Sequence, residues 1–154
     1  MKLISLPAIF VLPIVVMVMT SCGDPPLNAP NNQTLNNIRL IYAFVSEAEY
    51  ESGKPITQIL TNEPPNGKDY NASLVRILDK RLGAKMPKRS PDGVMRLLDA
   101  WGHPFEIYPN KTAVELGFPK DFLREKQALA IWSIGFNGKN EFGRGDDVVY
   151  KPSE

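Results

Sequence analysis

The sequence predicts an α+β fold in which helices come first and a small antiparallel sheet of about three strands follows. Apolar residues recur at helical spacing between residues 34 and 82, whereas short apolar runs typical of strands begin after Met95. The two kinds of segment form separate blocks, and this order favours an α+β fold in which the helices pack on the sheet. A loop rich in glycine and side-chain oxygen, of the kind that binds calcium, joins the last two strands.

The longest predicted helix starts at Thr34, whose hydroxyl can cap it, and ends near Gly53 and Pro55. Its polar residues lie mostly off one apolar stripe, so we expect an amphipathic helix that packs one face on the sheet. The stripe contains Leu35, Ile38, Ile41, Tyr42, Val45 and Ala48.

A second, shorter helix is predicted from Ala72 to Leu82, with Gly83 as its stop. The segment between the two helices, residues 56–70, contains Pro-Pro and Asn-Gly pairs, which predict a loop with one short helical turn near Ile59. After the second helix, residues 85–93 predict another connection rich in turns.

Three strands are predicted in the second half of the chain, over residues 105–109, 128–135 and 147–150. Between the first two, residues 111–127 are mostly polar and predict a connection with a helical turn at residues 120–125.

Residues 1–21 have the features of a bacterial lipoprotein signal peptide. Lys2 precedes an apolar run, residues 3–19, that is shorter than the ~20 residues of a membrane-spanning helix and is interrupted by Pro7 and Pro13. We therefore expect an exported protein of the bacterial cell envelope, on the periplasmic or outer-membrane side.

The only cysteine, Cys22, follows Met19-Thr20-Ser21, and this arrangement resembles the bacterial lipobox. The resemblance implies that a diacylglycerol is attached to Cys22, that the chain is cleaved before it, and that acyl chains such as palmitate hold it on a membrane. The alternative is a plain signal peptide, which would leave a lone thiol in an oxidising compartment. Residues 22–33, rich in Pro and Asn, predict a flexible tether, and residues 34–154 a single globular domain.

The mature chain is electroneutral, because the signal peptide contains one of the 18 basic residues and none of the 17 acidic ones. The one basic cluster, residues 85–90, includes a proline and is followed by another, and no basic run carries interleaved aromatic residues. This pattern excludes the electrostatic footprint of nucleic-acid binding. The expected partners are the membrane, through the anchor, and a protein of the envelope or of a secretion system.

Side-chain oxygens are concentrated between Ser133 and Tyr150. Four glycines in this segment allow sharp bends, so that carboxylates, amides and backbone carbonyls can converge on one hard cation such as calcium. The alternative is an ordinary long hairpin turn with solvated charges. The oxygen donors of this loop are Asn137, Glu141, Asp146 and Asp147.

Two blocks of the sequence, residues 99–105 and 133–148, resemble parts of the C-terminal domain of the major pseudopilin of type II secretion systems. The first block is Asp-Ala-Trp-Gly-His-Pro-Phe at residues 99–105, which resembles the family motif Asp-Pro-Trp-Gly-x-Pro-Tyr at the start of a strand. The second contains Ser-Ile-Gly at residues 133–135 and Gly-Arg-Gly-Asp-Asp-Val at residues 143–148, which in the family enter and leave a calcium loop.

The resemblance implies four calcium ligands in this chain: the carbonyl of Ile134 and the side chains of Asn137, Asp146 and Asp147. Asn137 stands where the family has Asp, which keeps an oxygen ligand but removes a charge, and Glu141 is a candidate to compensate. The N-terminus departs from the family, because a lipobox replaces the prepilin peptidase site and the long apolar helix. We therefore do not expect filament assembly by the family's route.

Together these features predict a non-catalytic, lipid-anchored module with a calcium-stabilised structural or interaction domain, accessory to protein secretion or envelope assembly. A competing hypothesis is a metal-dependent hydrolase that uses Asp146, Asp147 and His103. The chain contains neither a Gly-x-Ser-x-Gly nor a His-Glu-x-x-His motif, which disfavours that hypothesis. We expect His103 to be structural, and Trp101 and Trp132 to be core or sheet-face aromatics.

Overall fold

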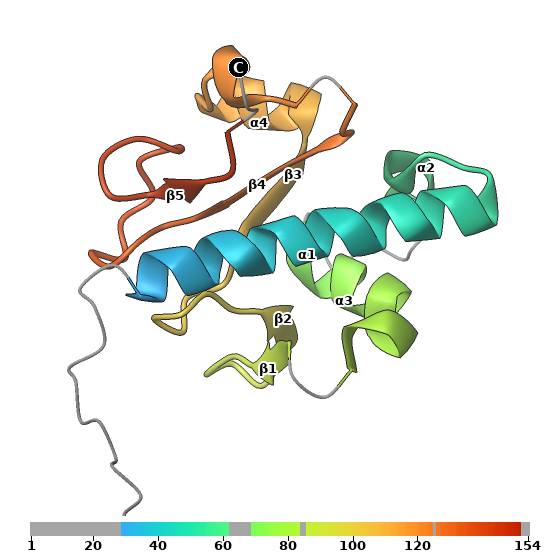
Figure 1. The fold of residues 1–154 in the computed structure, drawn as a ribbon, viewed down its shortest axis with the longest axis horizontal. Helices are drawn as coiled ribbons and strands as arrows, with labels where there is room; N and C mark the ends of the chain where they lie inside the picture. Colours follow the sequence, from blue (N-terminus) through green and yellow to red (C-terminus); the bar gives the residue numbers. More distant parts are fainter. Residues whose placement is uncertain (1–28, 62–68, 84–85, 125, 152–154) are drawn as a thin grey trace, which may run out of the picture.

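The structure, a computed structural model, describes residues 29–61, 69–83, 86–124 and 126–151. It has the predicted α+β fold: a long helix and several shorter ones pack on a three-stranded antiparallel sheet (Figure 1). Residues 1–21, the predicted signal peptide, and Cys22 lie outside the described residues. None of the helices in the described part of the chain combines the length and the apolar character that crossing a membrane requires.

The long helix, α1, runs from Ala29 to Ser52 and so begins earlier than predicted. The tether predicted for residues 22–33 is therefore wrong for its last five residues, which form the start of the helix. Pro30 explains this, because proline suits the first turn, where its missing N–H has no intrahelical partner. Thr34 is fully buried inside α1, and instead of capping the helix its Oγ1 accepts a hydrogen bond of 3.2 Å from the backbone N–H of Ala100.

One face of α1 supplies the centre of the main hydrophobic core, and it is the predicted stripe with one exception. Leu35 is half-buried, while the other five apolar positions are buried between the sheet and helix α3 (Tyr70–Leu82). Each fully buried side chain of this size contributes about 1.5–3 kcal/mol, so this face fixes α1 across the sheet. The buried stripe residues are Ile38, Ile41, Tyr42, Val45 and Ala48.

Two further helices follow, α2 (Ile56–Thr61) and α3 (Tyr70–Leu82), close to where the sequence predicts a helical turn and a helix. Helix α3 starts two residues earlier than predicted because the Asp69 carboxylate accepts a hydrogen bond of 3.0 Å from Ala72 N. It ends at Gly83, at a φ of 59° that favours glycine, as predicted.

Residues 87–97 form a hairpin that the sequence does not predict. Its strands, β1 (Pro87–Arg89) and β2 (Met95–Leu97), pair antiparallel in a separate two-stranded sheet. The buried Asn71 of α3 links β2 to the residue that precedes strand β3 (Glu106–Pro109): its Nδ2 donates to the carbonyls of Leu97 (3.0 Å) and Phe105 (2.8 Å), and its Oδ1 accepts from Leu97 N (2.7 Å).

The main sheet has the order β3–β4–β5, with all pairs antiparallel, and its strands confirm the three predicted ones with slightly shorter ends. All five residues of the central strand β4 are buried. Leu129 and Ile131 belong to the core beneath α1, whereas Ala130 and Trp132 belong to a second core on the opposite face. The strands are β3 (Glu106–Pro109), β4 (Leu129–Ser133) and β5 (Val148–Val149).

The second core is covered by a helix that sequence reasoning missed, α4 (Asn110–Leu116), in a segment predicted to be a polar connection. The α4 sequence carries one fully buried apolar residue, Ala113, and no side-chain N-cap, so it lacks the usual helix signals. The predicted turn at residues 120–125 corresponds to a short 3-10 helix, η2 (Lys120–Phe122). As a result β4 is covered on both faces, and its far end emerges into the oxygen-rich loop.

Candidate metal site

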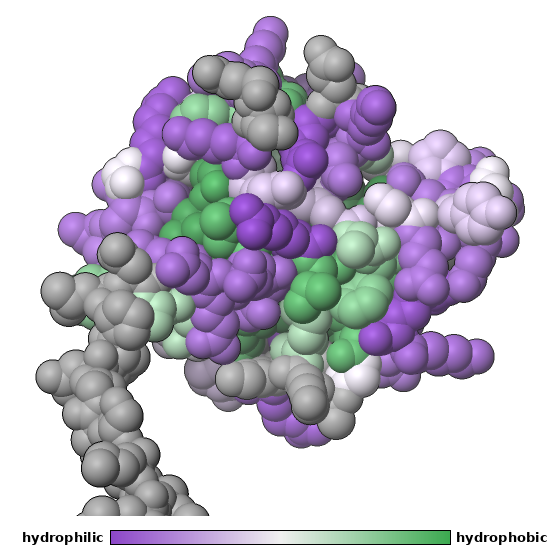
Figure 2. All heavy atoms as spheres, in the orientation of Figure 1, coloured by the Kyte–Doolittle hydropathy of each residue, from purple (hydrophilic) through white to green (hydrophobic). Residues whose placement is uncertain are grey.

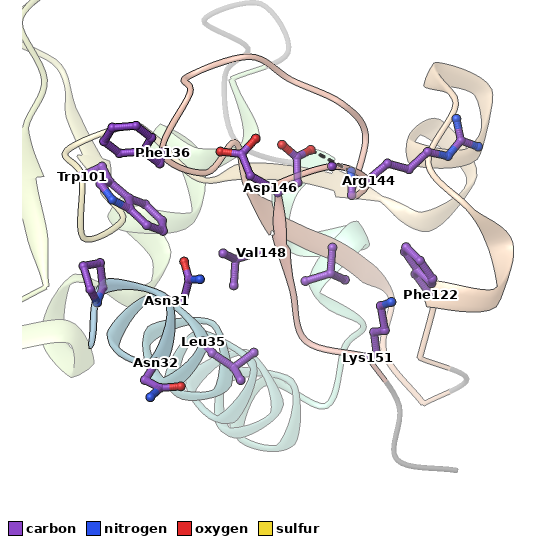
Figure 3. A pocket seen from close by; sticks show the side chains of 15 residues that line it. Asn31, Asn32, Leu35, Trp101, Phe122, Phe136, Arg144, Asp146, Val148 and Lys151 are labelled. Atoms are coloured by element: carbon purple, nitrogen blue, oxygen red, sulfur yellow. Dashed lines mark hydrogen bonds between the residues drawn. The ribbon is translucent and has the colours of Figure 1, made fainter. Parts of the chain in front are cut away.

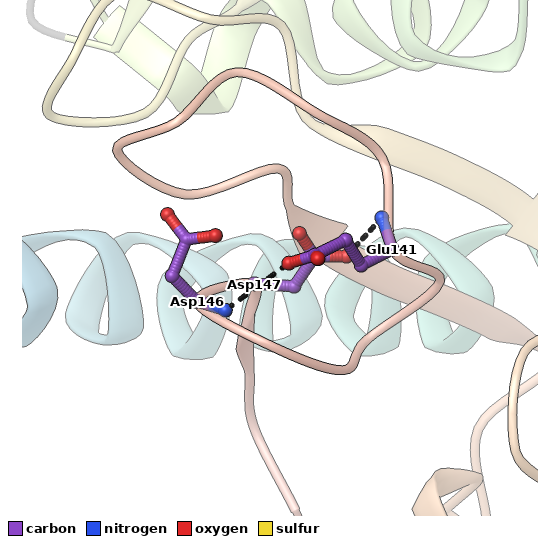
Figure 4. Close-up of side chains that lie close together, drawn as sticks. All are labelled: Glu141, Asp146 and Asp147. Atoms are coloured by element: carbon purple, nitrogen blue, oxygen red, sulfur yellow. Dashed lines mark hydrogen bonds between the residues drawn. The ribbon is translucent and has the colours of Figure 1, made fainter.

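The loop that joins β4 to β5 brings three carboxylates together: Glu141, Asp146 and Asp147 (Figure 4). One oxygen from each lies within 4.8 Å of the others, which is close enough for all three to contact a single cation. Asp146 and Asp147 are the two acidic ligands that the sequence predicts. Glu141, named there only as a candidate to compensate for a missing charge, completes the group.

Asp147 is the best-anchored of the three carboxylates. Its Oδ2 accepts hydrogen bonds from the backbone N–H groups of Gly143 (2.8 Å) and Glu141 (3.1 Å). Its Oδ1 is buried, and no donor among the described residues reaches it. A buried carboxylate oxygen without a donor is costly, and a bound cation is one of the few partners that can satisfy it.

The electrostatics at Asp147 agree with this geometry. Burial raises the pKa of its carboxyl above the usual value, and the negative charges of Glu141 and Asp146 raise it further. The two backbone N–H groups work in the opposite direction. Three carboxylates brought this close together repel one another, and a divalent cation between them would offset that repulsion.

Asn137 lies against Asp146 but does not present its oxygen to it. Its backbone N–H donates to Asp146 Oδ2 (2.9 Å), and its side-chain Nδ2 donates to Asp146 Oδ1. The Asn137 Oδ1 accepts instead from Lys139 N (2.6 Å). The amide therefore orients the Asp146 carboxylate here, and its role as a calcium ligand stays a prediction. So does that of the carbonyl of Ile134, the residue that directly follows β4.

Two glycines allow the loop to close around the carboxylates. At Gly145, with a φ of 58°, an added Cβ would lie 1.9 Å from the Glu141 carboxylate. At Gly135, with a φ of 65°, it would lie 2.3 Å from the backbone carbonyl of Asp146. At Gly135 the clash is with backbone, so a side chain does not fit there. At Gly145 the end of the Glu141 side chain would have to move, and the positive φ also favours glycine. Glu141 is held there by accepting a hydrogen bond of 3.3 Å from Asp146 N.

The base of the loop is fixed by Asp99, a buried residue whose role sequence reasoning missed. Its Oδ1 accepts from the backbone N–H groups of Trp101 (2.9 Å) and His103 (2.8 Å). Its Oδ2 accepts from the Ser133 hydroxyl (2.5 Å), whose oxygen accepts in turn from Gly135 N (3.1 Å). Asp99, the first residue of one sequence block, is thus hydrogen-bonded to Ser133, the first residue of the other. The presence of both blocks in one chain is the sequence signal that could have indicated this contact.

Trp132 contacts the loop from the protein interior and is fully buried, as predicted for a core aromatic residue. Its ring stacks on Phe118 at a centroid distance of 4.6 Å, and its Nε1 donates to Asn140 Oδ1 (3.1 Å). The same Asn140 oxygen accepts from Phe142 N (3.0 Å). Nothing in the sequence pattern singled out Asn140, because a polar residue in a polar loop carries no signal.

His103 does not join the carboxylates, since the metal-type group in the described part of the chain contains no histidine. Its Nδ1 lies 3.0 Å from the carbonyl of Gly135, and its nearest charged neighbour is Asp99, at 3.8 Å. Ser133 is fully buried and donates to Asp99, so it is not paired with His103 as a nucleophile would be. The arrangement can bind a cation and fix a loop.

Comparison of the chain with models of protein families, with characterised proteins and with solved structures finds no significant match. The resemblance to the pseudopilin domain therefore stays a prediction that rests on the two sequence blocks.

Proposed function

We propose that this protein is a non-catalytic, lipid-anchored module whose β4–β5 loop is stabilised by calcium. The observation that carries the proposal is the group formed by Glu141, Asp146 and Asp147, with the buried Asp147 Oδ1 that no described donor reaches. This oxygen pairs with a cation instead of with a hydrogen-bond donor. The domain around it acts as a structural or interaction module in protein secretion or envelope assembly.

Calcium is favoured over other cations by the chemistry of the donors. Every candidate ligand in the loop is an oxygen, whereas zinc sites in proteins draw mainly on Cys and His. Calcium also accepts 6–8 ligands in irregular geometry, which suits a loop of irregular backbone better than the strict octahedron of magnesium. Glu141 supplies the third negative charge that Asn137, standing where the resembled family has Asp, does not provide.

The role of the ion is to hold the loop closed. Without it, the three carboxylates repel one another and the stability of the β4–β5 connection falls. With it, residues far apart in the loop are linked through one point, and the domain gains about 2.7 kcal/mol when calcium is present at 100 times its dissociation constant. The surface formed by the loop is then fixed in one shape.

Cys22 anchors the module. The lipobox resemblance supports acylation at this residue, and two or more acyl chains give stable membrane attachment where one chain does not. Metabolic labelling with a lipid precursor tests this, because Cys22→Ser must lose the label.

Thermal unfolding of the purified protein in calcium and in a chelator tests the loop. We expect calcium to raise the Tm of the wild type and to leave the Tm of the double variant Asp146→Asn, Asp147→Asn unchanged. Asp121→Asn, an exposed acidic residue on η2, is the matched control and must keep the calcium response. No shift of the wild-type Tm at millimolar calcium would refute the proposal.

A further inference from the structure

A groove of about 810 Å³ lies between the first turns of α1 and the β4–β5 loop (Figure 3). We refer to it as the α1–loop groove. Its walls include Asn31 and Leu35 of α1, and Val148 lies between them and the loop. Trp101 and Phe136 are found together at one end. Figure 2 shows hydrophobic residues gathered beside the first half of α1, over β5.

Phe136 is the feature that needs an explanation. It lies in the turn that begins the β4–β5 loop, and 77% of its surface is exposed to solvent. Trp101 beside it is only partly buried, so two aromatic side chains face the solvent at this end of the groove. Exposed apolar surface of this kind, rimmed by polar residues, marks a contact site.

The length of the preceding chain limits what can reach this surface. Cys22 lies seven residues before Ala29, and an extended chain spans at most ~3.3–3.6 Å per residue, so the start of α1 lies within about 25 Å of the anchor. The first turns of α1 form a wall of the α1–loop groove. The far end of α1, near Tyr50, lies about 30 Å from the start of the helix along its axis.

We propose that the occupant of this surface is the lipid bilayer that holds the anchor, with Phe136 and Trp101 in contact with its headgroup region. This inference rests on the proposed lipidation of Cys22. Tryptophan is enriched at the membrane–water interface, and aromatic and aliphatic side chains at the surface of a protein add to peripheral membrane binding. The groove side also carries two basic residues suited to lipid phosphates, Arg144 and Lys151.

Calcium binding would favour contact between the β4–β5 loop and the membrane. The loop from Ser133 to Tyr150 has three acidic residues and two basic ones, so a bound divalent cation changes its formal charge from −1 to +1. A positive loop is attracted to anionic lipids, and a rigid loop holds Phe136 in place. The ion that closes the loop therefore gives the surface that contacts the bilayer a positive charge and a fixed shape.

The two tryptophans of the chain allow a direct test, because Trp132 is fully buried and Trp101 is at the groove. The full-length lipidated protein is reconstituted in calcium into vesicles of phosphatidylcholine and anionic phosphatidylglycerol with brominated acyl chains, which quench nearby tryptophan fluorescence. We expect quenching in the wild type and its loss in Trp101→Phe. Phe136→Ser, at an exposed position, must reduce the quenching, while Tyr50→Ser, which removes an aromatic residue that is 90% exposed at the other end of α1, must not.

Several results would overturn the inference. Unquenched wild-type fluorescence in protein whose mass contains the lipid means that the anchor is present but this face does not meet the bilayer. Unquenched fluorescence together with a dimer in sedimentation means that a second copy covers the groove. A mass without lipid refutes the anchor itself, and with it the docking. Circular dichroism of each variant excludes unfolding as the cause of a lost signal.

Discussion

The carboxylate of Asp99 accepts three hydrogen bonds, from Trp101 N, His103 N and the Ser133 hydroxyl, and it is almost fully buried. The turn before β3 and the end of β4 are therefore held by one side chain. Because the β4–β5 loop begins directly after Ser133, its starting position depends on this contact. Asp147 plays the corresponding role at the other end, where it accepts two backbone hydrogen bonds from the loop.

Replacing Asp99 should therefore destabilise the domain strongly. Asp99→Ala leaves three donors without a partner, and each buried unsatisfied donor costs about 1–3 kcal/mol, so we expect a loss of about 3 kcal/mol or more in the free energy of unfolding. Urea denaturation measures this value. Asp79→Ala, at an exposed position of α3, is the matched control and should change it by less than about 0.5 kcal/mol. A loss at Asp99 as small as that of the control would contradict the assigned role.

The sequence predicts some elements of this chain better than others. An element is predicted well when its own residues form an apolar pattern, because that pattern is visible in the sequence. Helix α1 and strand β4 carry clear apolar patterns and are predicted in the right places, although α1 begins five residues earlier than predicted. Helix α4 and the β1–β2 hairpin are short and mostly polar, and they are set by contacts with other parts of the chain. Such elements leave no periodicity to detect.

Glu106, on the edge strand β3, carries a negative charge whose effect on the free energy of unfolding should depend on pH. Burial raises the pKa of Glu106, and the charges of Asp147 and Asp69 raise it further, although a hydrogen bond from Tyr108 lowers it. A folded-state pKa above the unfolded value means that the protonated form is favoured by folding. The stabilisation is present below the usual pKa of Glu and is lost as the pH rises through the folded value.

We therefore expect Glu106→Gln, which removes the charge but keeps the shape, to be more stable than the wild type at pH 7 and no more stable at pH 4. Urea denaturation of both proteins at the two pH values measures the difference in their free energy of unfolding. Glu115→Gln, at an exposed position on α4, serves as the control and should show no such difference. A wild type that is the more stable protein at pH 7 would rule out the expected cost of this charge.

At the scale of the whole molecule, a sheet covered on both faces presents one loop beside the start of its longest helix (Figure 1). The sequence identified the loop and its two aspartates, since consecutive acidic residues among glycines are visible in one dimension. It did not identify Asp99 or Asn140, because their function arises only when distant segments meet. The proposed anchor and the proposed calcium site both act on this single end of the molecule.

Equilibrium dialysis of the purified protein against radioactive calcium measures binding to the loop itself, because it counts bound ions without relying on stability. We predict one saturable site. Its affinity should fall by about tenfold or more in Asp147→Asn, a loss of at least about 1.4 kcal/mol in binding free energy, and stay unchanged in Asp121→Asn. No binding at millimolar calcium, or equal binding by the Asp147→Asn variant, would contradict it.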